Sequence, residues 1–123
     1  AVADYRIAEV ADQKIKKAAD EIVLNLIRNP DILATVAAGD KRPFCVGFAA
    51  ETQDLEAYAR NKLTSKNLDM IAANRVDSTD TGFEVDHNAL SLFWDNGSIT
   101  LPAQPKTLIA LRLVDIIADQ FLS

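Results

Sequence analysis

The sequence contains one cysteine, Cys45, and one histidine, His87, among 123 residues. A single cysteine excludes an internal disulfide and a zinc site built from several thiolates, and it fits a reducing compartment such as the cytoplasm. A single histidine offers little material for a histidine-based proton relay, and its position in a polar loop favours a surface role. Cys45 lies at the start of a predicted core strand, which predicts a small buried side chain there.

The chain also lacks long apolar runs and an excess of positive charge. Runs such as Leu108–Leu111 are far too short to span a bilayer. The net charge of −5 disfavours nucleic acid as a partner, because a polyanion repels an acidic chain. A hydrophobic content of 49% with 25% charged residues is typical of a globular domain with its own core. We therefore expect residues 1–123 to belong to a single domain.

The sequence contains neither a Walker phosphate-binding loop nor a Gly-x-Gly-x-x-Gly motif. The middle of the chain nevertheless has the order of strands and helices of a nucleotide-binding fold. An apolar run at Phe44–Phe48 precedes a helix that begins at Thr52 or Gln53, and a second apolar run follows at Leu68–Ala73. The helix carries apolar residues four apart, at Leu55, Ala59 and Leu63. A strand, a crossover helix and a second strand are the unit of parallel sheets, so the predicted fold class is α/β.

Capping signals mark a shorter helix upstream of this unit. Glu21–Ile27 is a short run rich in β-formers. Asn29 before Pro30 predicts the N-cap of a helix, with Asp31 placed against the helix dipole. Gly39 is the predicted end of that helix.

The last third of the chain predicts a hairpin and a closing helix. Asn96-Gly97 is a strong turn signal, and it lies between the predicted strands Asn88–Trp94 and Ser98–Leu101. The helix is predicted over Gln104–Leu122. Its broad apolar face, expected to pack on the sheet, includes Leu108, Leu111, Ile116 and Phe121.

Two groups of lysines each allow two interpretations. Lys14, Lys16 and Lys17 could belong to a solvated loop, or could form a mobile clamp over a phosphate, since an ammonium suits oxygen-rich polyphosphate. Lys62 and Lys66 lie four apart near a helix end, where lysines complement the macrodipole. The same spacing would also let both reach one triphosphate, and spacing alone does not decide between the two roles.

Two polar side chains are further candidates for ligand binding. Asp4 follows Ala1–Ala3, which resemble the end of a strand, and it could bind Mg²⁺ or a ribose hydroxyl or be a plain turn residue. Asn29 is expected to cap its helix, and a ligand could share that helix end. None of these signals is specific alone, but together they are typical of a nucleotide site.

Five motifs occur in the order and at the spacings of one known family. They are Ala1–Tyr5, Lys14–Lys17, Asn29–Ile32, Val46–Thr52 and Lys66–Asp69, and the likeness extends over Gly82-Phe83, Asp86–Leu90 and the final helix. These motifs resemble the phosphopantothenoylcysteine synthetase family, found in the C-terminal part of the bacterial bifunctional coenzyme A biosynthesis flavoprotein. The family begins well before Ala1, so the chain resembles the C-terminal half of the synthetase domain, without its glycine-rich turn and an upstream asparagine.

The resemblance implies a fold and a reaction. The fold would be a Rossmann-like three-layer structure with a mostly parallel sheet, a C-terminal β-hairpin and an antiparallel dimerisation flap around Tyr5–Ile27. The reaction would be a ligation in which the carboxylate of 4′-phosphopantothenate attacks the α-phosphate of CTP, with Mg²⁺, and L-cysteine then displaces CMP. FMN would belong only to the decarboxylase domain, which the chain does not contain.

The resemblance also implies roles for nine residues. Asp4 would meet the nucleotide and its metal, and Lys14 would bind the nucleotide and act catalytically on it and on the intermediate from the mobile flap. Lys62 and Lys66 would hold the phosphates. The residues that would lie against CTP are Asn29, Pro30, Asp31, Ile32 and Phe48. The alternative is a nucleotide-binding or dimerisation fragment without catalysis.

Overall fold

The structure is a computed structural model that describes residues 2–16, 20–76 and 87–123, without the side chains of 87 and 88. Expectations for Ala1, Lys17, Gly82-Phe83 and Asp86 therefore lie outside the described residues. The elements are β1 (Tyr5–Ile7), β2 (Leu26–Arg28), α1 (Ile32–Ala37), β3 (Val46–Glu51), α2 (Leu55–Ser65), β4 (Met70–Arg75), β5 (His87–Trp94), β6 (Gly97–Pro105) and α3 (Lys106–Leu122). Within these ranges, no helix has both the length and the apolar character needed to cross a membrane.

The main sheet has four strands in the order β3-β4-β5-β6. Strands β3 and β4 are parallel and joined by α2, which confirms the predicted strand–helix–strand unit and the α/β class. Strands β5 and β6 form the predicted hairpin, with Trp94 paired to Gly97. The expectation of a mostly parallel sheet is wrong for the described strands, because β5 runs antiparallel to β4 and the tight turn then reverses β6. The sheet is mixed.

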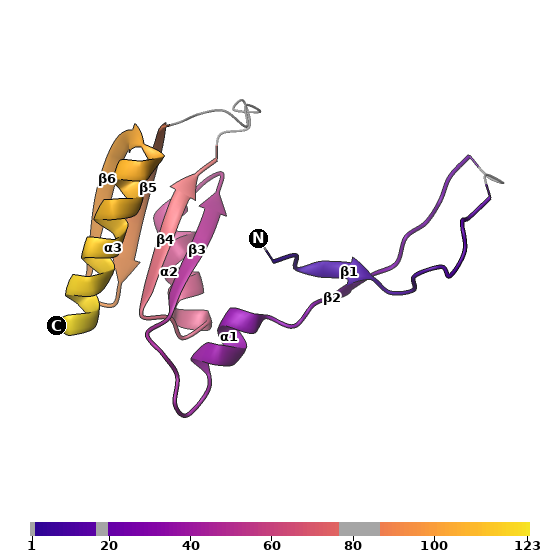
Figure 1. Ribbon diagram of the computed structural model, residues 1–123, viewed down its shortest axis with the longest axis horizontal. Coiled ribbons are helices and arrows are strands. Elements are labelled where there is room, and N and C mark those ends of the chain that lie inside the picture. Colours follow the sequence, from indigo (N-terminus) through magenta and orange to yellow (C-terminus); the bar gives the residue numbers. More distant parts are fainter. Residues whose placement is uncertain (1, 17–19, 77–86) are drawn as a thin grey trace.

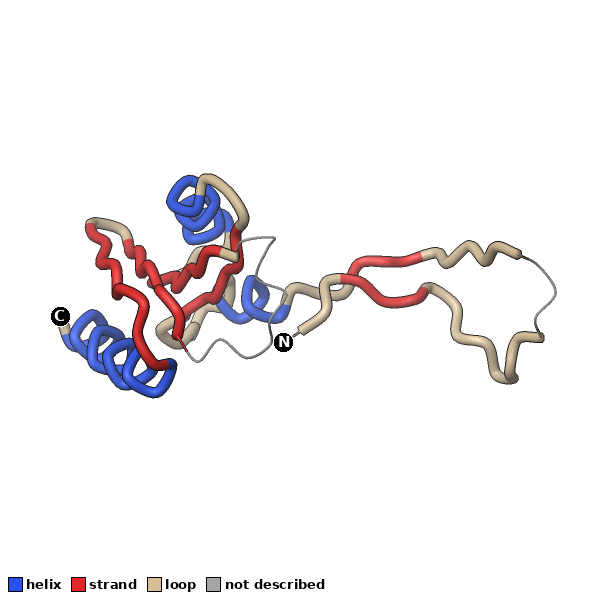
Figure 2. Tube along the Cα trace, turned by 90° about the horizontal axis from the view of Figure 1, so that it is seen from above, coloured by secondary structure: helices blue, strands red, loops and turns tan. Residues whose placement is uncertain are grey.

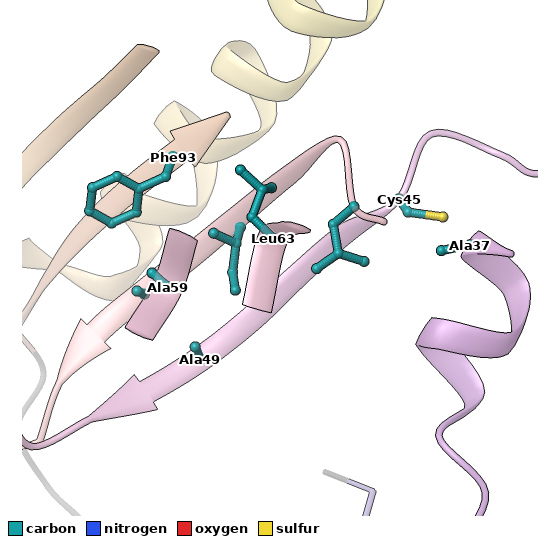
Figure 3. Close-up of a cluster of buried hydrophobic side chains, with 9 residues drawn as sticks. Ala37, Cys45, Ala49, Ala59, Leu63 and Phe93 are labelled. Carbon is teal, nitrogen blue, oxygen red and sulfur yellow. The ribbon is translucent and has the colours of Figure 1, made fainter. Parts of the chain in front are cut away.

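Two helices cover the two faces of this sheet, so the structure has three layers (Figures 1 and 2). On one face, Ala59 and Leu63 of α2 pack with Phe93 and with alternate residues of β4 (Figure 3). On the other face, Ile109 of α3 packs on Met70 and Ala72. Burial on both faces explains why the first four residues of β4, Met70 to Ala73, are all apolar. The predicted apolar stripe of α2 and the burial of Cys45 are confirmed.

The predicted sheet-facing side of α3 is only partly correct. Ile116 packs on the core beside Leu113 and Ile117. In contrast, Leu108, Leu111 and Phe121 are exposed by 42%, 66% and 63%. The helix has apolar residues around most of its circumference, so more of them are present than one face of the sheet can cover.

Strands β1 and β2 form a separate antiparallel pair at the base of a long arm (described residues 5–16 and 20–28), which extends away from the main sheet (Figure 2). This pair confirms that the predicted flap is antiparallel, and dimerisation through it stays a prediction. Of the β-rich run Glu21–Ile27, only the end lies in a strand, because β2 begins at Leu26. Val2 and Ala3 lie in no strand of the described structure, which corrects the expectation that Ala1–Ala3 end one.

Candidate functional site

A hollow of about 490 Å³ lies beside the edge strand β3, between the base of the arm, the start of α1 and the second half of α2. The arm base and the start of α1 meet next to β3 in Figure 1. We call this the edge hollow. Its lining residues are Val2, Ala3, Asp4, Tyr5, Arg28, Asn29, Pro30, Asp31, Ile32, Leu33, Phe48, Lys62 and Lys66. The structure thus brings together all of the sequence-predicted site residues except Lys14.

Two lysines of α2 reach the edge hollow, and each is paired with a carboxylate. The Nζ of Lys62 lies 2.6 Å from Oε1 of Glu51, the last residue of β3. The Nζ of Lys66 lies 2.9 Å from Oδ2 of Asp31. The i,i+4 spacing therefore does place both ammonium groups on one cavity. Both ion pairs are partly exposed, so each contributes little to stability, but both lysines line the same cavity.

Asp31 is the cap of α1 as well as a partner of Lys66. Its Oδ1 accepts a hydrogen bond of 3.0 Å from the backbone N–H of Ala34. That N–H, followed by the ammonium of Lys66, holds the pKa of the Asp31 carboxyl below its usual range. Asp31 consequently keeps its negative charge at the hollow under all ordinary conditions.

Asn29 is not the N-cap that its position before Pro30 predicts, because its side chain is engaged elsewhere. Its Nδ2 donates to the carbonyl of Ala3 at 2.8 Å, and its Oδ1 accepts from Nη1 of Arg6 at 3.0 Å. Its backbone N–H donates to the carbonyl of Asp4 at 2.8 Å. Asn29 therefore joins the segment that enters the arm to the segment that leaves it, and this junction forms one wall of the edge hollow.

Lys14 lies in the part of the arm between β1 and β2 and does not line the edge hollow. Within the described residues its ammonium has no hydrogen bond or ion pair. The arm projects away from the sheet in both views (Figures 1 and 2). In this conformation the arm lysine and the two helix lysines do not share a cavity.

Three residues with polar or charged side chains at the site were not predicted as site residues from the sequence. Glu51 holds Lys62, and the only available signal was its position at the end of an apolar strand. Arg28 and Tyr5 line the hollow from the paired ends of β2 and β1. Arg28 directly precedes a predicted site residue, but pairing with Tyr5 depends on the register of the arm, which the sequence did not reveal.

The residues at the hollow could bind a divalent cation only if a bound phosphate group supplied further ligands. No cluster of three His, Cys, Asp or Glu side chains that could hold a metal occurs in the described ranges. Asp4 supplies one carboxylate at the hollow, and Mg²⁺ is commonly held by one or two carboxylates together with substrate phosphates and water. Asp4 therefore fits a cation that enters with a nucleotide.

An α/β domain with a hollow lined by cations, carboxylates and an aromatic ring has the character of a domain that binds a charged small molecule. The chain belongs to the family described as DNA/pantothenate metabolism flavoprotein C-terminal domain, which it matches over residues 1–121.

Curated relatives agree with this assignment. The chain is 52% identical over 123 residues to the coenzyme A biosynthesis bifunctional protein CoaBC of Vibrio cholerae. The aligned region covers 98% of this chain and 31% of that protein. The protein of the same name from Escherichia coli K12 is 51% identical over 125 residues, and that from Bacillus subtilis is 42% identical over 119. The chain thus spans less than a third of the relatives that it matches.

Solved structures show the same fold. The crystal structure of the C-terminal domain of a CoaBC protein superposes with a TM-score of 0.69 at 34% identity, covering 94% of this chain and 48% of that one. The DNA/pantothenate metabolism flavoprotein from Streptococcus pneumoniae superposes with a TM-score of 0.61 at 26% identity, covering 82% and 45%. The Rossmann-like α/β fold implied by the family resemblance is confirmed, and the relatives are named for coenzyme A biosynthesis.

Proposed function

We propose that this chain forms part of the CTP site of a phosphopantothenate–cysteine ligase of coenzyme A biosynthesis. The observation that carries the proposal is the edge hollow, where Lys62, Lys66 and Asp4 meet the aromatic side chain of Phe48. Relatives named for bifunctional coenzyme A biosynthesis support the pathway. A cytoplasmic location remains a prediction from the single cysteine.

The proposed chemistry is an activation followed by an amide bond formation. The carboxylate of 4′-phosphopantothenate attacks the α-phosphorus of CTP, pyrophosphate leaves, and an acyl-cytidylate forms. The amine of L-cysteine then attacks the acyl carbon, CMP leaves, and the amine loses a proton. A carboxylate oxygen is a poor leaving group, and the cytidylyl group makes it a good one.

The lysines of the hollow have the charge that the first step needs. Negative charge concentrates on the phosphates as pyrophosphate leaves, so Lys62 and Lys66 would stabilise that charge. Mg²⁺, brought with the nucleotide and shared with Asp4, would supply further neutralisation. Phe48 is 71% exposed, so its ring is free to contact a base or a sugar. Asn29, Pro30 and Ile32 would shape the wall against CTP.

Lys14 would act on the bound nucleotide from the arm. In the described conformation it is remote from the hollow, so this role requires another position of the arm, or an arm supplied by a second copy of the chain. Apolar side chains such as Val10 and Val23 are 83% and 86% exposed on the arm, which supports a homodimer formed through it.

A thermal-shift series tests whether the 123-residue chain binds CTP. A ligand that binds only folded protein raises the unfolding midpoint, so CTP with Mg²⁺ is expected to raise it more than ATP or GTP do. Equal shifts for the three nucleotides would show a site without the proposed selectivity. No shift with any nucleotide would overturn CTP binding by this chain and favour the alternative, a fragment that serves only in dimerisation.

A further inference from the structure

The three cations that line the edge hollow differ in what already neutralises them. Lys62 and Lys66 each form an ion pair with a carboxylate. Arg28 lines the same hollow, but within the described part of the chain its guanidinium has no hydrogen bond or ion pair. Of these three cations, Arg28 is thus the one whose donors are available to a ligand.

The backbone of Arg28 is held by hydrogen bonds, although its guanidinium has no hydrogen bond or ion pair within the described residues. Arg28 is the last residue of β2 and pairs with Tyr5 of β1, and its carbonyl accepts a hydrogen bond of 3.2 Å from Nη1 of Arg6. The next residue, Asn29, donates hydrogen bonds from its side-chain amide to the carbonyl of Ala3 and from its backbone N–H to the carbonyl of Asp4. Residues directly opposite in an antiparallel pair project to the same side, which agrees with Tyr5 and Arg28 both lining the hollow.

We propose that Arg28 binds a phosphate group of a substrate in the edge hollow. This assignment rests on the proposed function and adds a residue that the sequence motifs did not include. Phosphate recognition favours arginine, because the planar guanidinium offers parallel N–H donors that match two phosphate oxygens. A lysine already paired with a carboxylate must exchange that partner to bind a phosphate equally well, whereas Arg28 has no hydrogen-bonded partner to exchange within the described residues.

The position of Arg28 relative to Asp31 supports the same role. Arg28 is close enough to the Asp31 carboxyl to contribute, as the smallest cause, to lowering its pKa, and Lys66 binds that same carboxyl. Arg28 and Lys66, which come from two different elements, thus both act on the Asp31 carboxylate at the edge hollow. A phosphate bound by these two cations would lie near that carboxylate, and their two positive charges would offset its repulsion.

Two phosphate-bearing substrates could supply the group: the triphosphate of CTP and the phosphate of 4′-phosphopantothenate. Titration calorimetry distinguishes them in a full-length protein that carries this chain. Wild type, Arg28→Ala and Arg28→Lys are each titrated with CTP and Mg²⁺, and separately with 4′-phosphopantothenate. Arg112→Ala, which removes an exposed arginine of α3 outside the hollow, is the matched control.

Arg28→Ala is expected to weaken binding of one of the two probes by about 10- to 100-fold, the usual effect of losing a charged hydrogen-bonding partner. Arg28→Lys is expected to recover part of the loss, since it keeps the charge but not the paired donors. The unfolding midpoint is expected to stay near that of wild type, because the side chain is exposed. The probe that weakens identifies the source of the phosphate.

The outcomes separate this assignment from the proposed function. If wild type binds CTP and Lys62→Ala binds it more weakly, while Arg28→Ala binds both probes as wild type does, Arg28 has no binding role and the proposed function stands. An equal loss in Arg112→Ala would show a general charge effect and would also overturn the assignment. If wild type binds neither probe, the proposed function fails and the assignment fails with it.

Discussion

Nη1 of Arg6 donates to Oδ1 of Asn29 at 3.0 Å and so joins the base of the arm to the residue two positions before the cap of α1. The Asn29 amide in turn donates to the carbonyl of Ala3. These contacts link the two chain segments that pass between the arm and the body, at the wall of the edge hollow. The position of Asp4 thus depends on a side chain that sequence reasoning assigned to helix capping.

Asn29→Ala is expected to weaken CTP binding by about 5- to 10-fold, because each lost hydrogen bond contributes roughly 0.5–1.5 kcal/mol to holding the wall. Both bonds are at the surface, so the free energy of unfolding is expected to fall only by about 1 kcal/mol, the lower end of the range for two bonds. Calorimetry measures the affinity and urea unfolding measures the stability. Asn61→Ala, an exposed asparagine of α2, is the control, and unchanged CTP binding in Asn29→Ala would contradict a role for this contact.

Local patterns predicted the elements of the body well. Ala59 and Leu63 are buried because the sequence repeats apolar residues every four positions on one helix face. Asn96-Gly97 gave the hairpin because its backbone preference selects the turn directly. These signals depend on residues close in the chain, and they are not overruled by the rest of the fold.

Contacts between distant segments were not predictable from the same patterns. Asn29 and Asp31 are both good capping residues two positions apart, and the choice between them follows from Arg6 and Ala3, which lie more than 20 positions away. The Glu51–Lys62 pair likewise joins the end of a strand to the third turn of a helix. Periodicity could not orient α3 either, since apolar residues such as Leu111 occur on its exposed side.

Asp69→Asn tests the hydrogen bonds that link Asp69, just before β4, to Arg42 and Cys45, just before β3. Asp69 accepts two hydrogen bonds from Arg42, at 2.6 and 2.7 Å, and one from the backbone N–H of Cys45 at 2.7 Å. Replacing one oxygen by an amide is expected to lower the free energy of unfolding by roughly 1–3 kcal/mol, because these bonds involve a charge and are partly buried.

The control for this prediction is Glu56→Gln, which breaks an exposed i,i+4 pair with Arg60. That change is expected to cost only about 0.3–0.5 kcal/mol. Both values come from urea or guanidinium unfolding curves. A loss for Asp69→Asn no larger than that for Glu56→Gln would show that the Asp69 contacts add nothing beyond an ordinary surface pair.

Lys62→Ala is expected to weaken CTP binding by about 10-fold, since a charge-assisted bond to a phosphate would be lost. Removing Lys62 also leaves Glu51 unpaired near the hollow, which adds repulsion toward the triphosphate. Calorimetric titration with CTP and Mg²⁺ measures the effect, with Lys41→Ala as a control at an exposed lysine. Normal CTP affinity in Lys62→Ala would favour the other interpretation, in which Lys62 only complements the helix dipole.

The lowered pKa of Asp31 predicts that the free energy of unfolding depends on pH in the acid range. Its pKa is lowered in the folded state, so the contribution of its charge is present above the unfolded pKa of about 3.9 and is lost as the pH falls through the lower folded pKa. Asp31→Asn keeps a capping side chain without the charge. The stability difference between wild type and Asp31→Asn is therefore expected to shrink as the pH is lowered from about 5 toward 2.

Urea unfolding at a series of pH values measures this difference. Lys66→Ala is the informative companion, because the Ala34 N–H is the larger cause of the lowered pKa and remains in that variant. The part of the pH dependence that comes from the Ala34 N–H is expected to persist in Lys66→Ala, and the part that comes from the ammonium is expected to be lost. A wild-type to Asp31→Asn difference that stays constant across the series would contradict the assignment of Asp31 as the charged cap.

Lys14 gives the prediction that separates binding from catalysis. It does not line the edge hollow, so Lys14→Ala is expected to leave CTP affinity nearly unchanged in a full-length protein that carries this chain. If Lys14 reaches the nucleotide during the reaction, turnover is expected to fall by about 100-fold, which corresponds to roughly 3 kcal/mol of transition-state stabilisation. Lys16→Ala, two positions along the same arm, is the matched control for a general loss of charge. Equal turnover in wild type and Lys14→Ala would remove Lys14 from the mechanism, and an equal fall in both variants would assign the effect to the charge of the arm as a whole.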